Sequence, residues 1–78
     1  MIDEVTCKCH TSLEKDGMKF FEGREYQLDH EYTAVFEEWR VYPSGGSYCC
    51  VKFETLPEFE FYFTENVKVR NTRKILYF

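Results

Sequence analysis

The sequence is poor in the residues and patterns that mark several large protein classes. It holds only two Pro and four Gly, which excludes collagen-like, Pro-rich and Gly-rich chains. Its longest apolar runs are three or four residues, whereas a membrane-spanning helix needs about 20. Residues 1–15 carry charges every few positions and have no apolar run. We therefore expect no signal peptide, no membrane span and a cytoplasmic location.

Positive charge is also scarce over most of the chain. Residues 1–60 contain thirteen Asp and Glu against six Lys and Arg, and the whole chain has a net charge of −4. This acidic field opposes binding to nucleic acid or to an anionic membrane. The exception is a basic C-terminal segment that could contact an anion, namely Lys68, Arg70, Arg73 and Lys74.

Aromatic side chains are abundant, at 19% of the 78 residues. A chain of this length forms one domain, here residues 1–78. Rings suit a small core, because each can bury about 150–250 Å². Eight Phe, six Tyr and one Trp are nevertheless more rings than one small interior holds. Either some rings are exposed for binding or the protein forms a homodimer.

The apolar pattern has a period of two over most of the chain, which indicates strands. Val5, Cys7 and Cys9 alternate with polar residues, as do Tyr26 and Leu28 within residues 24–29. The alternation of Phe with Glu and Tyr predicts a further half-buried strand over 59–63. Short strands at close spacing predict an all-β fold, a small barrel or roll of five to seven short antiparallel strands with little helix.

Two segments leave alternatives open. In residues 31–42 the apolar residues move from one face of the predicted strand to the other at Glu37 and Glu38. The segment therefore forms a bulged strand, two separate strands, or one strand with Val35, Trp39 and Val41 inward. Residues 64–74 form either strand or a helix capped by Thr64. Between these segments, the Pro-Ser-Gly-Gly sequence at 43–46 predicts a hairpin of 39–42 with 47–54.

Residues 20–28, Phe-Phe-Glu-Gly-Arg-Glu-Tyr-Gln-Leu, resemble an element of small SH3-like barrel proteins of bacteriophages and prophages. The element has the pattern apolar-x-x-Gly-Lys/Arg-x-Tyr-x-apolar, and Val5-Thr6-Cys7 resembles the strand before it. The resemblance covers mainly residues 3–30 and implies an SH3-like barrel, a phage origin and a small protein that acts by binding. Gly23 is expected to relieve a turn with positive φ.

The cysteines and histidines do not form a recognisable reactive or metal-binding motif. Cys7-Lys8-Cys9-His10 and Cys49-Cys50 lack the C-x₂₋₄-C spacing of a zinc knuckle. We expect Cys7, Cys9 and Cys49 to be small buried hydrophobic residues, with a disulfide or zinc as alternatives. His10 and His30 are expected to be exposed. No catalytic residue, cofactor or metal is predicted.

The expected function is that of a non-enzymatic binding protein. We expect a phage-encoded protein that modulates or inhibits a host or host-defence protein, for example as an anti-CRISPR inhibitor. Exposed aromatics near carboxylates are typical of protein interfaces, and the candidates are Tyr32, Phe36, Trp39, Tyr48, Glu37 and Glu38. The alternatives are a nucleic-acid-binding barrel that uses the basic C-terminal segment and a structural subunit of a larger assembly.

Overall fold

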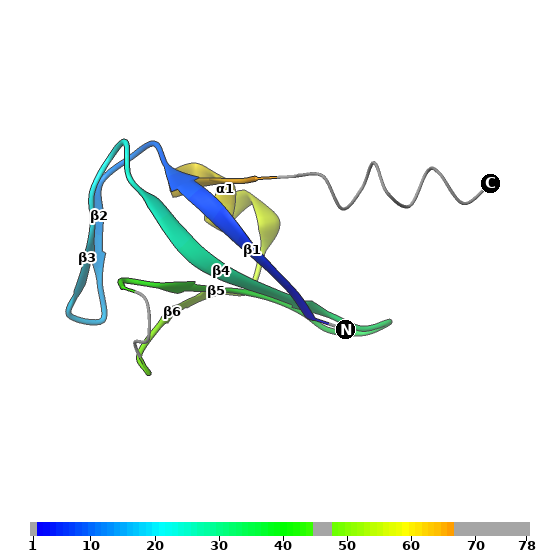
Figure 1. The fold of residues 1–78 in the computed structure, drawn as a ribbon. Helices are drawn as coiled ribbons and strands as arrows, with labels where there is room; N and C mark the ends of the chain where they lie inside the picture. The colour runs from blue at the N-terminus through cyan, green and yellow to red at the C-terminus, as the bar shows by residue number, and fades with distance from the viewer. Residues whose placement is uncertain (1, 45–47, 67–78) are drawn as a thin grey trace.

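The computed structural model describes residues 2–44 and 48–66 of the chain. These residues form seven strands and one short helix (Figure 1). The elements are β1 (Ile2–Cys9), β2 (Leu13–Lys15), β3 (Met18–Phe20), β4 (Glu25–Tyr32), β5 (Glu37–Tyr42), β6 (Val51–Phe53), α1 (Leu56–Tyr62) and β7 (Phe63–Glu65). The all-β prediction, with five to seven strands and little helix, is confirmed over the described residues.

Five of the strands form one antiparallel sheet in the order β6-β5-β4-β1-β7. The sheet curls into a half-barrel, and β2 and β3 form a separate hairpin between β1 and β4 (Figure 1). The last described strand, β7, pairs with β1 through Cys9↔Phe63 and Cys7↔Glu65. The chain therefore brings its first and last described strands together, which is how a short sequence closes one side of a curled sheet.

The core lies on the concave face of this sheet. Directly paired residues of antiparallel strands point to the same face, so the pairs Cys7↔Tyr26 and Leu28↔Val41 place all four side chains inward. Phe20 from β3 and Phe59 from α1 complete the cluster. The buried members are Cys7, Cys9, Phe20, Tyr26, Leu28, Trp39, Val41, Val51, Phe53, Phe59 and Phe63. Cys7 and Cys9 are each 0% exposed, as the alternation predicts.

Phe63 lies at the centre of the aromatic contacts. Its ring centroid is 5.5 Å from that of Phe20, 5.7 Å from that of Phe59 and 5.9 Å from that of Phe53. The contacts with Phe20 and Phe53 are edge-to-face, and the contact with Phe59 is stacked. Such ring pairs add about 0.5–1.5 kcal/mol to the gain from burial. One ring therefore links the sheet, the helix and the β2–β3 hairpin.

The prediction of a strand over 59–63 is wrong, because residues 56–62 form the helix α1. Thr55 is the N-cap and its hydroxyl accepts a hydrogen bond from the Glu58 backbone N–H at 3.4 Å. Pro57 lies in the first turn, where its missing N–H costs nothing. Helical spacing turns Phe59 into the core and leaves Phe61 63% exposed, although a strand would place both on one face.

Residues 31–42 form two separate strands, which is one of the three arrangements left open by the sequence. β4 ends at Tyr32 and β5 begins at Glu37, with a four-residue turn between them. The Thr33 N–H donates to the Phe36 carbonyl at 2.7 Å and closes this turn. Because the turn separates the two strands, the odd-numbered residues Trp39 and Val41 of β5 point inward, and Val35 does not enter the core.

Positive backbone angles occur where the turns require them. Gly23 has φ +90°, as expected, and its N–H donates to the Cys9 carbonyl at 2.8 Å. Asp16 and Gly17, at φ 54° and 78°, form the two-residue connection of β2 with β3. An Asp-Gly pair is the typical sequence for such a hairpin. Residues 13–15 and 18–20 therefore form a β-hairpin.

The expected hairpin of 39–42 with 47–54 is confirmed in its paired part, where Trp39, Arg40 and Val41 face Phe53, Lys52 and Val51. Gly45 and Gly46 of its turn lie outside the described residues, as do Val67–Phe78, which include most of the 64–74 segment. Thr64 and Glu65 belong to β7. Among the described residues, no helix has the length and apolar character to span a membrane.

Candidate interaction surface

The structure divides the predicted partner-binding residues between two ends of β5. Tyr32, Phe36 and Glu37 lie together around the β4–β5 turn, where Tyr32 pairs with Glu37. Tyr48 lies three positions before β6, and Val51 at the start of β6 pairs with Val41 near the far end of β5. Tyr48 is fully exposed, at 101%. The predicted residues therefore do not form one surface.

Trp39 is 2% exposed, so the expectation of an exposed tryptophan is wrong. Its ring stacks between His30, at a centroid distance of 4.8 Å, and Phe59, at 5.8 Å. The reason is its position in β5, where it pairs with His30 on the concave face. Trp39 is thus the end of the aromatic core rather than a contact for a partner.

Glu38 is also buried, at 9% exposure, contrary to its assignment as an exposed acidic contact. One of its oxygens accepts a hydrogen bond from Arg40 Nη1 at 2.7 Å, and Glu31 accepts from the same atom at 2.8 Å. These hydrogen bonds, with that to Glu38 the larger contribution, raise the pKa of the Arg40 guanidinium above its ordinary value. Glu38 therefore holds Arg40 on the convex face, next to the turn.

His30 is half-buried, although the sequence predicts an exposed histidine. Its Nε2 lies 2.7 Å from Glu37 Oε2, and its Nδ1 lies 3.5 Å from Glu65 Oε1. Glu37 lies across the β4–β5 turn from His30, and Glu65 is distant from it in the sequence. No local sequence motif therefore predicts these two contacts. The imidazole links β4 to the start of β5 and to β7, and it fixes the strand that leads into the β4–β5 turn.

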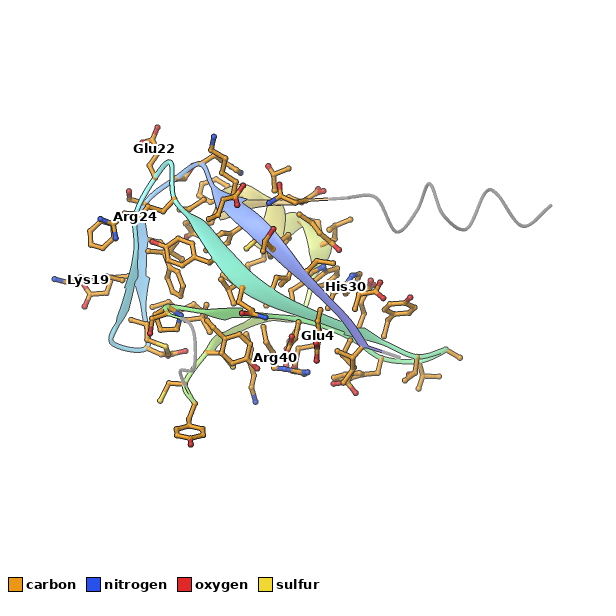
Figure 2. The ribbon with its side chains drawn as sticks, in the orientation of Figure 1. Glu4, Lys19, Glu22, Arg24, His30 and Arg40 are labelled. Atoms are coloured by element: carbon orange, nitrogen blue, oxygen red, sulfur yellow. The ribbon has the colours of Figure 1, made fainter. Side chains whose placement is uncertain are left out.

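Figure 2 shows His30 toward the end of the sheet that carries the β4–β5 turn, with Glu4 and Arg40 nearer the middle of the sheet. Lys19, Glu22 and Arg24 lie at the other end, around the β2–β3 hairpin. His10 is exposed, as predicted, and its Nε2 lies 2.8 Å from the Glu60 carbonyl oxygen. Its ring therefore joins the end of β1 to α1.

The cysteines divide into two buried and two more accessible thiols. Burial, followed by the charge of Cys9, raises the pKa of the Cys7 thiol to about 12. Burial also raises the pKa of Cys9. Both thiols therefore stay protonated at neutral pH and are poor nucleophiles. None of the four cysteines, all within the described residues, forms a disulfide.

Cys49 is exposed, so the prediction that it is buried is wrong. Residues 47–54 do not form one long strand, because β6 covers only Val51–Phe53. Cys49 therefore precedes the paired residues and does not enter the concave face. Within residues 2–44 and 48–66, no three His, Cys, Asp or Glu side chains gather in a way that could hold a metal ion.

Several large apolar side chains that the sequence does not single out are exposed among the described residues, namely Ile2, Phe21, Val35, Leu56 and Phe61, and Val35 is the most exposed of them. It is 95% exposed, Phe36 beside it is 45% exposed, and Ala34 is exposed as well. We call these three residues the turn surface. The turn contains no Gly, Pro, Asn or Asp, which are the residues that hairpin turns favour. It is held instead by Thr33, whose hydroxyl accepts the Val35 N–H at 3.3 Å and whose N–H binds Phe36.

The signal for this surface is present in the sequence, as an apolar Ala-Val-Phe run between acidic residues. It is hidden by the ambiguity of 31–42, since an inward Val35 is one of the arrangements that the parity allows. The basic residues of the alternative anion contact, Lys68, Arg70, Arg73 and Lys74, lie outside the described residues.

Comparison with known proteins adds no relative to this description. No protein-family model matches the chain, and neither the curated proteins nor the solved structures contain a match to it. The resemblance of residues 3–30 to phage SH3-like barrel proteins therefore stays a prediction.

Proposed function

We propose that this protein is a non-enzymatic binding module that recognises a protein partner through the turn surface. The observation that carries the proposal is the 95% exposure of Val35, beside an exposed Phe36, in a turn without the usual turn residues. Leaving adjacent apolar side chains in water gives no gain in folding. A contiguous exposed apolar patch is a common mark of a protein interaction site.

The environments of Cys7, Cys9 and His30 support a non-enzymatic role. The thiols of Cys7 and Cys9 are buried and protonated, and the imidazole of His30 is held by Glu37 and Glu65. Each of these groups has a structural partner or a place in the core. A nucleophile needs a base within hydrogen-bond reach and access to substrate, and these groups serve packing and strand pairing instead.

The more specific form of the proposal is a phage-encoded inhibitor of a host or host-defence protein that acts in the host cytoplasm. It rests on the resemblance of residues 3–30, on the small size and on the net charge of −4. An anti-CRISPR protein is one example of this class. The structural-subunit alternative uses the same kind of surface, but its partner is a component of a permanent assembly.

Photo-crosslinking tests the proposal. A benzophenone amino acid replaces Val35, and in matched variants it replaces Tyr48 or Phe61, which are also exposed. Each variant is incubated with cell lysate and irradiated, and the products are identified by mass spectrometry. We expect the Val35 probe to yield one dominant protein adduct. Adducts from Tyr48 or Phe61 alone would move the surface elsewhere. Adducts with nucleic acid would contradict the proposed function, and so would the absence of any macromolecular adduct from all three probe positions.

A further inference from the structure

We infer that the turn surface fits an apolar pocket with a rim of Lys and Arg on a partner protein. This inference rests on the proposed function and adds the chemistry of the partner. Val35 and Phe36 provide the apolar contact. The carboxylates around the base of the turn provide the charge that selects the rim.

The register places these carboxylates beside the turn. Tyr32↔Glu37 is the last pair before it, followed by Glu31↔Glu38 and, one step further, by His30 with Asp3 and Trp39. Glu37 keeps 49% of its side chain exposed and Glu31 keeps 31%. Both are therefore available to a charged group that approaches the turn, in addition to their contacts within the sheet.

The cations of the described residues do not neutralise this end of the sheet. Arg40 is shared by Glu31 and Glu38, so one positive charge faces two carboxylates. His30 faces Glu37 and Glu65. Among the described residues, this end of the sheet thus holds more carboxylates than cations, and a basic rim complements it.

The contacts also hold the turn in one shape. The Thr33–Phe36 and Thr33–Val35 hydrogen bonds fix the loop, and the His30–Glu37 contact fixes the first residue of β5. An interface that is ordered before binding loses less conformational entropy on association. A second copy of this chain is a poor occupant, because it would bring the same carboxylates against each other.

The test is an NMR titration of the whole protein with three synthetic amphipathic peptides. Each presents the same Leu and Phe face, and the flanking positions are Lys and Arg, Gln, or Glu. We expect the basic peptide to bind about 10-fold tighter than the acidic one at low salt, with the difference shrinking as salt screens the charges. The largest shift changes should fall on the backbone amides of 33–37.

The variant Val35→Asp keeps the fold, since Val35 is 95% exposed, and should abolish these shift changes, whereas Tyr48→Asp should not. Equal affinity for the acidic and basic peptides would overturn the inference that the partner's pocket has a basic rim. Shift changes centred on α1 or near Tyr48 overturn the choice of surface. Binding by none of the peptides also counts against the inference, while the crosslinks from Val35 decide separately whether the protein has a protein partner at all.

Discussion

Single residues carry much of the information in this chain, and Gly23 is the clearest case. Its φ of +90° lies in the left-handed region that residues with a Cβ avoid. A Cβ at Gly23 would meet no atom within 4 Å, so a substitution there is opposed by backbone strain and not by a clash.

We therefore expect Gly23→Val to lower the free energy of unfolding by about 1–3 kcal/mol. Lys19→Val is the control, because Lys19 is an exposed residue of β3 with ordinary extended geometry. It should change stability by less than about 0.5 kcal/mol. Urea titration followed by Trp39 fluorescence measures both. Equal stability of the two variants would mean that the turn adapts to a side chain at Gly23.

The cysteines make a second comparison at the same scale. Cys7 is 0% exposed, whereas Cys49 is exposed. Cys7→Ser places a hydroxyl in the core and should cost about 1–3 kcal/mol. Cys49→Ser should be close to neutral, and in the wild type Cys49 should react with a thiol reagent long before Cys7 does. Rapid modification of Cys7 at neutral pH would contradict both its burial and its raised pKa.

At the scale of elements, α1 shows how a local signal overrides a period-two pattern. The Phe-Glu-Phe-Tyr-Phe run of 59–63 alternates like a strand, yet Thr55, Pro57 and Glu58 before it are an N-cap, a first-turn Pro and an acidic first-turn residue. These are the standard signals for the start of a helix.

Thr55→Ala should therefore destabilise the protein by about 0.5–2 kcal/mol through loss of the N-cap. Thr55→Ser keeps the accepting oxygen and is the matched control. Thermal unfolding by circular dichroism distinguishes them. A Thr55→Ala protein that melts with the wild type would show that core packing of Phe59 and Phe63 holds the helix without its cap.

Phe61 and Phe63 give a sharper test of the same element, since a strand would bury them together. Phe63→Ala removes a ring that is 0% exposed and should cost about 3–5 kcal/mol. Phe61→Ala removes a ring that is 63% exposed and should cost less than about 1 kcal/mol. Chemical denaturation of the two variants measures the difference. Equal losses of unfolding free energy in the two variants would contradict the helix and favour the strand that the alternation predicts.

At the scale of the whole molecule, short-range periodicity predicts the all-β class and the inward Cys7 and Cys9. The turn residues at 43–46 predict the pairing of β5 with β6. Neither signal predicts partners that are distant in sequence. The contact of His30 with Glu65 and the stacking of Trp39 on Phe59 depend on how the sheet curls. For that reason Trp39 looks like a surface residue in the sequence and is buried in the fold, whereas Glu38 is covered through its contact with Arg40, two residues along β5.

The candidate surface was only partly predictable for the same reason. One turn brings Tyr32, Phe36 and Glu37 together. The local sequence predicts this grouping if residues 31–42 are taken as two strands. Tyr48 is separated from them by the length of β5. Val35 emerges only when the turn is placed, because its exposure depends on which of three arrangements residues 31–42 adopt.

The turn surface is the proposed binding site, and one affinity measurement tests this role most directly. The partner identified by crosslinking is purified, and its affinity is measured for the wild type, Val35→Asp and Tyr48→Asp. Both variants are first shown to melt at the same temperature as the wild type. We predict that Val35→Asp binds at least about 10-fold more weakly, as expected when a central contact is lost, while Tyr48→Asp binds like the wild type. Unchanged affinity of Val35→Asp, with a loss in Tyr48→Asp, would contradict the account.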